Sequence, residues 1–256
     1  MHAITTTFLK ALVAAAVALA LASGPAAAAQ VNVAVAANFT EAAKEIAAAF
    51  KQNTGDDAIL SFGSSGQLYT QITQGAPFQI MLSADDERPK KLVSDGLAEP
   101  ANRFTYAIGK LVLWSKNPSL VQGADTLKAN AFTRLSIASP AAAPYGAAAV
   151  ETLKALKLYD TLQPKIVEGN SIAQAFQFID TGNAELGFIA LSQLAGRSEG
   201  SRWMVSQDLY TSIRQDAVLL KTGASNPAAV AFISFLQGPE AHAIITRFGY
   251  ATTGEN

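Results

Sequence analysis

Residues 60–72 read LSFGSSGQLYTQI and place two serines between two glycines, where an apolar run meets a helix-like segment. The run at 58–62 predicts a strand, and a helix is predicted from about Ser65 to Gln74, closed by Gly75. Ser64 or Ser65 is therefore a candidate nucleophile, helix cap or ligand for a negatively charged group. Each role needs different residues elsewhere in the chain.

The strand-then-helix order recurs along the whole chain, which predicts an α/β fold. Apolar runs predict strands at 31–36, 58–62, 78–82, 110–114, 134–139, 165–169, 185–190 and 217–220. Residues spaced by three and four predict a helix after most of them, starting with Phe39, Ala42 and Ile46. Two further helices are expected to begin near Asn226 and Pro239.

Residues 1–29 have the three parts of a secretory signal peptide. A segment ending in Lys10 precedes the apolar residues 11–22, and the small residues 23–29 offer a cleavage site. An apolar core of 12 residues is shorter than the roughly 20 that a membrane-spanning helix needs. We expect an exported protein, and because the chain has no cysteine for a lipid anchor, we expect it in the periplasm.

The charge balance excludes several classes of partner. Cleavage after Ala29 leaves 227 of the 256 residues, and loss of Lys10 reduces the 19 basic residues to 18 against 20 acidic ones, a net charge of −2. Without a basic cluster, a nucleic-acid partner is not expected. No second apolar stretch approaches the length of a membrane-spanning helix, so we expect no membrane insertion of the mature chain. We also expect the mature protein to be a monomer.

Two kinds of catalytic site lack the residues they need. A serine nucleophile requires a general base, yet His242 is the only histidine after residue 29, and Gln67 stands where a G-x-S-x-G elbow needs its last glycine. The sequence does not exclude a serine hydrolase that uses a lysine as its general base. A metal site would have no cysteine ligand and only that one histidine. The acidic residues 85–87 are more typical of a solvated helix start.

Polar residues and glycines recur where a strand passes into a helix. Asn38, with Glu41 three residues on, fits a capping box, and similar turns lie at 64–65, 143–147 and 169–173. Each could be a plain cap. Together, several helix N-termini could converge on one anion, because parallel sheets bind ligands at the carboxyl ends of their strands.

A family resemblance extends over nearly the whole chain after residue 29. The segments 34–39, 61–72, 75–92, 103–115, 143–146 and 185–191, in that order, resemble the periplasmic molybdate-binding proteins of ABC importers. The resemblance implies a type II periplasmic-binding-protein fold, with two lobes, each a mixed sheet flanked by helices, joined by a two-strand hinge. It also implies molybdate or tungstate as ligand, an ABC permease as partner, no cofactor and no catalytic activity. Metal would bind only as the oxyanion.

The resemblance also implies which residues contact the oxyanion. By matching motif positions they are Ala37, Asn38, Ser65, Tyr145 and Ile172. Many relatives have serine in place of Asn38, and many have a ligand tyrosine in place of Ala190. Tyr145, where those relatives have a small residue, is expected to replace that lost hydroxyl from the opposite wall.

The matched positions include no charged residue, so the oxyanion would be held by neutral N–H and O–H donors. Such a site favours an ion without a proton of its own, such as molybdate, tungstate or sulfate, over hydrogen phosphate. Serine and tyrosine hydroxyls can also accept hydrogen bonds, which leaves this selectivity open. Two alternatives remain: a binding protein for sulfate or another oxyanion, and an exported hydrolase using Ser65.

The order of the elements predicts how the chain is divided between the lobes. Residues 30–107 and 218–256 are expected in one lobe and residues 108–217 in the other. The chain would then cross twice, near residues 105–110 and 212–217, with the ligand between the lobes.

Overall fold

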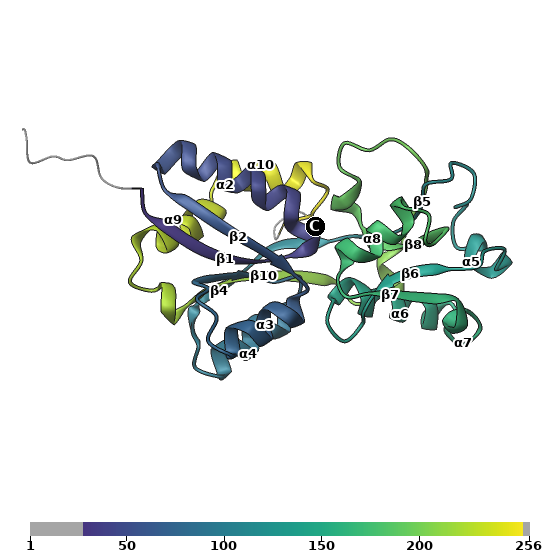
Figure 1. The fold of residues 1–256 in the computed structure, drawn as a ribbon, viewed down its shortest axis with the longest axis horizontal. Coiled ribbons are helices and arrows are strands. Elements are labelled where there is room, and N and C mark those ends of the chain that lie inside the picture. The colour runs from purple at the N-terminus through teal and green to yellow at the C-terminus, as the bar shows by residue number, and fades with distance from the viewer. Residues whose placement is uncertain (1–27, 253–256) are drawn as a thin grey trace, which may run out of the picture.

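The computed structural model describes residues 28–252, which form two lobes, each built on a five-stranded sheet (Figure 1). The predicted signal peptide at 1–29 lies outside the described residues except for its last two positions. The two-lobe α/β architecture with mixed sheets confirms the fold expected from the sequence.

The first sheet combines parallel strands from the start of the chain with antiparallel strands from later segments. Its order is β2 (Asp57–Gly63), β1 (Gln30–Ala36), β3 (Ile80–Leu82), β10 (Ile213–Leu220) and β4 (Ala98–Gly109). β1 runs parallel to β2 and β3, whereas β10 is antiparallel to both β3 and β4. The carboxyl ends of β1, β2 and β3 therefore meet at one edge of this sheet.

Helices cover both faces of the first sheet, so its central strands are buried on both sides. Val33 and Val35 pack with α2 (Thr40–Thr54), α9 (Pro227–Leu236) and α10 (Pro239–Arg247). Ala34, which points the other way as the period of a strand requires, packs with α3 (Ser65–Thr73) and α4 (Glu87–Ser94). Among the described residues, no single helix is long and apolar enough to span a membrane. α9 and α10 reach that length and composition only together, with a bend of 58° between them.

The second sheet repeats the mixed arrangement of the first. Its order is β7 (Ile166–Gly169), β6 (Leu135–Ala138), β8 (Leu186–Ala190), β5 (Leu111–Ser115) and β9 (Ser201–Met204). β6 is parallel to β7 and β8, and β5 is antiparallel to β8 and β9. Its helices are α5 (Asp125–Ala129), α6 (Pro144–Ala155), α7 (Tyr159–Leu162) and α8 (Ile172–Asp180).

Two segments connect the sheets, and both lie beside the point where the lobes face each other. β4 passes into β5 through Lys110, and the chain returns from β9 into β10. Within this connection Ile213 of β10 pairs with Gly109 of β4. The two connecting segments are therefore neighbouring antiparallel strands.

Three features of the fold differ from the sequence expectation. The long edge strand β4 and the four-residue strand β9 were not predicted, because neither shows a clear alternation of apolar and polar residues. β10 begins at Ile213 rather than at Ala217. The predicted capping box at Asn38 is wrong, because Asn38 lies in a 3₁₀ turn, Ala37–Phe39, and its side chain caps no helix.

Candidate functional site

A small cavity lies between the lobes, and all five residues predicted to contact ligand line it. Its lining residues are Ala36, Ala37, Asn38, Ser64, Ser65, Ala84, Ala143, Pro144, Tyr145 and Ile172. The space that the centre of a water molecule can reach is about 10 Å³, close to the least that one water needs. The cavity is therefore small, and contact of these residues with an oxyanion stays a prediction.

Three helices begin at this cavity. Ser65 and Ile172 are the first residues of α3 and α8, and Tyr145 is the second residue of α6. The N–H groups at these positions have no partner within their own helix, and the helix dipoles place partial positive charge there. Convergent helix N-termini of this kind favour an anion.

The two adjacent serines differ in what their side chains contact. Ser64 is the N-cap of α3: its Oγ accepts the N–H of Gln67 at 3.4 Å, while Gln67 Oε1 accepts the N–H of Ser64 at 3.2 Å. Ser65 is not a cap. Its Oγ accepts the backbone N–H of Ala84 at 2.9 Å, and the residue is 1% exposed.

Tyr145 brings a hydroxyl into the same region from the second lobe. Its Oη accepts a hydrogen bond from Gln215 Nε2 at 3.1 Å. Burial, followed by the neighbouring tyrosines Tyr250 and Tyr106, raises the pKa of Tyr145 well above its usual value, so the hydroxyl keeps its proton. A Cβ at Gly109 would lie 2.1 Å from this hydroxyl, so only glycine fits there.

Asn38 lines the cavity, and its side-chain amide is hydrogen-bonded within the protein. Its Nδ2 donates to Gln215 Oε1 at 2.9 Å and to Tyr250 Oη at 3.0 Å. Its backbone carbonyl accepts hydrogen bonds from Ser192 Oγ and Tyr250 Oη, both at 2.8 Å. The backbone N–H of Asn38 is thus the donor left for a ligand.

Sequence reasoning missed Gln215, Tyr250 and Ser192. Gln215 is fully buried on β10 and lies 177 residues from Asn38 in the chain, and Tyr250 lies 212 residues away. No local pattern links positions so far apart. The one signal was an uncharged polar side chain, Gln215, within the segment predicted to connect the lobes.

Hydrogen bonds between the lobes close the cavity on two sides. On one side Gly66 N–H donates to the carbonyl of Ala142, and Arg88 Nη2 donates to the carbonyl of Ala141, each at 2.9 Å. On the other side Ser192 donates to Asn38. A ligand in this cavity would be enclosed by both lobes.

Ala190, where many relatives have a tyrosine, is buried at the end of β8 and is not among the lining residues. Its N–H donates to Gln193 Oε1 at 3.0 Å, and Gln193 Nε2 donates to the carbonyl of Ile172 at 3.0 Å. Gln193 therefore joins the end of β8 to the start of α8. Tyr145, on α6 of the same lobe, is the tyrosine that lines the cavity.

The cavity is lined by uncharged residues only. His242 is not among them and is exposed on α10. Within residues 28–252 no group of three His, Cys, Asp or Glu side chains could hold a metal ion. Asp85 is paired with Arg88, in keeping with the helix-start interpretation of residues 85–87.

Comparison with known proteins identifies the family. Residues 31–251 match the family described as bacterial extracellular solute-binding protein. The chain is 55% identical over 250 residues to the molybdate-binding protein ModA of Rhodobacter capsulatus, covering 96% of this chain and 99% of that protein. A ModA of Azotobacter vinelandii is also 55% identical, over 87% of this chain and 90% of that protein.

The fold agrees with a solved relative. The structure of a periplasmic molybdate-binding protein of Azotobacter vinelandii matches with a TM-score of 0.84 and 42% identity, covering 87% of this chain and 99% of that chain. The fold is therefore that of the periplasmic binding proteins, as the resemblance implied. From its sequence matches and its two-lobed structure, the chain belongs to the bacterial extracellular solute-binding proteins and, within them, to the ModA family of molybdate-binding proteins.

Proposed function

We propose that this chain is a periplasmic solute-binding protein that captures molybdate, and tungstate, between its lobes and delivers it to the permease of an ABC transporter. The observation that carries the proposal is the uncharged cavity at which α3, α6 and α8 begin. Family membership supports the ligand class, because the relatives at 55% identity are named as molybdate-binding proteins.

The proposed contacts come from neutral donors only. Ala37, Asn38 and Ile172 would contribute backbone N–H groups, and Ser65 and Tyr145 would contribute hydroxyls as well. Hydrogen bonds to a charged acceptor contribute about 1.5–3 kcal/mol each, so several together offset the lost hydration of a dianion. The burial of all five residues supports these contacts, because little water would compete with them.

We further propose that the protein has no enzymatic activity and no cofactor. The nearest candidate for a nucleophile, Ser65, shares its cavity with no histidine, lysine or carboxylate. The hydrolase alternative therefore lacks a general base. The sulfate alternative is less favoured, because the sulfate-binding protein SubI of Mycobacterium tuberculosis shares the fold at 14% identity, whereas the molybdate-binding relatives reach 55%.

The division between the lobes is also a proposal: residues 30–107 with 218–256, and residues 108–217. It is supported by packing of α9 against β1 and of α10 against α2, which join the end of the chain to its beginning. Export to the periplasm rests on the signal-like residues 1–29 and on the relatives. We propose that the mature protein is a monomer without membrane insertion.

The test is a thermal melting series with molybdate, tungstate, sulfate and phosphate at neutral pH and constant ionic strength. A ligand that binds only the folded state adds about 2.7 kcal/mol at a hundredfold excess over Kd, which shifts the melting temperature by several degrees. Molybdate and tungstate should give this shift at low concentration. An equal shift with sulfate would favour the sulfate alternative, and no shift with any of the four would overturn the proposal.

A further inference from the structure

Three residues that line the cavity carry a hydroxyl: Ser64, which caps α3, and Ser65 and Tyr145, which the proposed function assigns to the ligand. A hydroxyl can donate one hydrogen bond and accept others, so its orientation decides what it offers to a ligand. A site of donors alone penalises a ligand that carries a proton, because that proton then has no acceptor. The selectivity of the cavity therefore depends on which way the hydroxyls of Ser65 and Tyr145 are turned.

The Ser65 hydroxyl is held as a donor toward the cavity by the backbone. Its Oγ accepts the N–H of Ala84 at 2.9 Å, an arrangement that cannot reverse because a backbone N–H only donates. Within the part of the chain that the structure describes, no protein group accepts the Ser65 proton. A buried hydroxyl proton needs an acceptor, and the cavity is where one can be supplied.

Tyr145 is held in the same way, by a side chain. Gln215 Nε2 donates to Tyr145 Oη at 3.1 Å, and within residues 28–252 no protein group accepts the Tyr145 proton. Gln215 is fully buried, so water does not replace it.

The orientation of the Gln215 amide follows from its other partners. Its Oε1 accepts a hydrogen bond from Asn38 Nδ2 at 2.9 Å. The single proton of Tyr106 Oη is shared between this oxygen, at 3.1 Å, and the carbonyl of Ser83, at 3.0 Å, so Asn38 is the partner that sets the amide orientation. Turning the Gln215 amide alone would bring two NH₂ groups face to face at Asn38. The observed network therefore directs Nε2 of Gln215 to Tyr145.

We propose that Gln215 is a specificity-determining positioning residue: by donating to Tyr145 Oη it turns the tyrosine proton toward the cavity, so that the site rejects tetrahedral oxyanions that carry a proton. This inference rests on the proposed function and deepens it. Gln215 acts through Tyr145 and does not line the cavity. Ser65, fixed by Ala84, supplies the second donor.

Sulfate and hydrogen phosphate are the probes, because both are tetrahedral dianions of similar size at mildly alkaline pH and only one carries a proton. Their dissociation constants are measured by competition against molybdate, at constant ionic strength, for wild type and Gln215→Met. Methionine has a similar length and flexibility but no amide. Its substitution frees Tyr145 to accept, so the preference for sulfate over phosphate should fall about tenfold, the effect of one hydrogen bond to a charged group.

Two further variants separate positioning from general damage. In a Tyr145→Phe background, Gln215→Met should leave the sulfate-to-phosphate ratio unchanged, because its effect passes through the tyrosine hydroxyl. Tyr106→Phe removes a different partner of Gln215 and should lower stability without changing the ratio. If Gln215→Met does not fold, Gln215→Asn tests the same contact, since its shorter amide cannot reach Tyr145.

An unchanged ratio, or a stronger preference for sulfate, in Gln215→Met would overturn the inference. The second result would mean that the Asn38 and Gln215 amides are both reversed and that Tyr145 donates to Gln215. A ratio change of the same size in the Tyr145→Phe background would also overturn it. Failure of the proposed function is distinguishable, because wild type would then bind neither molybdate nor tungstate.

Discussion

Ser64 and Ser65 are adjacent in the chain, yet their hydroxyls serve different parts of the structure. Ser64 Oγ accepts the N–H of Gln67 and closes the first turn of α3. Ser65 Oγ reaches across to Ala84, in the segment that follows β3. One serine therefore stabilises the helix, and the other joins two of the turns that form the cavity.

These two serines form a matched pair for mutation. Ser64→Ala should lower the free energy of unfolding by about 0.5–2 kcal/mol, the usual cost of a lost N-cap, and lower molybdate affinity less than Ser65→Ala does. Ser65→Ala should weaken molybdate binding about tenfold or more, because it removes a donor to a charged ligand. Denaturant unfolding and ligand titration of both variants check this. Equal affinity in wild type and Ser65→Ala would remove Ser65 from the site.

Gly109 is expected to be essential for the position of Tyr145. A Cβ there would lie 2.1 Å from Tyr145 Oη and 2.6 Å from Gln215 Nε2, so Gly109→Ala must displace both groups. We expect a loss of about 1–3 kcal/mol in stability from overpacking and weaker molybdate binding. Gly63→Ala is the control, because its nearest contact would be 3.4 Å from Leu68. Similar affinities in the two variants would show that Tyr145 tolerates displacement.

The pH dependence of binding should reflect the protonated Tyr145. Because burial raises its pKa well above the usual value of about 10, the hydroxyl remains a donor throughout the neutral and mildly alkaline range. Molybdate affinity, titrated at successive pH values, should stay constant up to about pH 10. A steep loss of affinity well below that pH, absent in Tyr145→Phe, would contradict the assignment.

Stability should fall at alkaline pH for a related reason. Burial raises the pKa of Tyr106, Tyr145 and Tyr250 in the folded state. A group with a raised folded pKa contributes stability that is fully present below its unfolded pKa, about 10, and is lost as the pH rises further. The melting temperature should therefore decline above about pH 10, and less steeply in Tyr106→Phe. Identical alkaline profiles would show that Tyr106 does not contribute.

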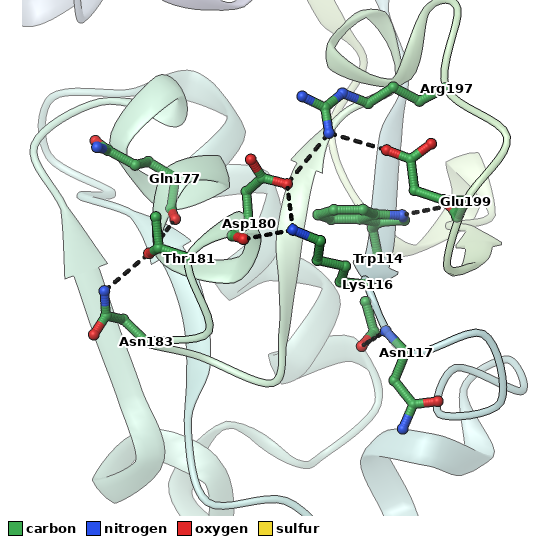
Figure 2. Close-up of polar contacts among 10 residues, drawn as sticks. Trp114, Lys116, Asn117, Gln177, Asp180, Thr181, Asn183, Arg197 and Glu199 are labelled. Atoms are coloured by element: carbon green, nitrogen blue, oxygen red, sulfur yellow. Dashed lines mark hydrogen bonds and ion pairs between the residues drawn. The ribbon is translucent and has the colours of Figure 1, made fainter.

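Trp114 should report ligand binding by fluorescence. It is fully buried, and its ring stacks on Phe176 of α8 with centroids 5.3 Å apart. Arg197 lies over the same Phe176 ring. It is also paired with Asp180, at the end of α8, and with Glu199 (Figure 2). A ligand held at Ile172, the first residue of α8, would thus act on the helix that carries the Trp114 contact.

We expect molybdate to change the emission of wild type and of Trp203→Phe, and to change that of Trp114→Phe much less. The measurement is a fluorescence titration of the three proteins. Trp203 is the matched control because it is partly exposed on the edge strand β9. A full response in Trp114→Phe would show that the signal arises elsewhere.

The sequence by itself determined the α/β architecture and the positions of most elements. A continuous apolar run such as Val33, Ala34 and Val35 indicates a strand buried on both faces, and the three- and four-residue spacing from Phe39 onward indicates α2. Family motifs brought out Ala37, Asn38, Ser65, Tyr145 and Ile172, and the structure gathers all five at one cavity. These signals are local, because the face of a strand or helix is formed by residues that are close together in the chain.

Only the tertiary structure decided which hydrogen-bond partners orient the polar side chains of the site. Asn38 was expected to cap a helix, but Gln215 and Tyr250, far along the chain, take up its side-chain amide instead. Ser65 and Tyr145 can each donate or accept in isolation, and the N–H groups of Ala84 and Gln215 make them acceptors within the protein. A hydrogen bond has no sequence periodicity when its partners come from different elements, so its direction is set only when folding brings those elements together.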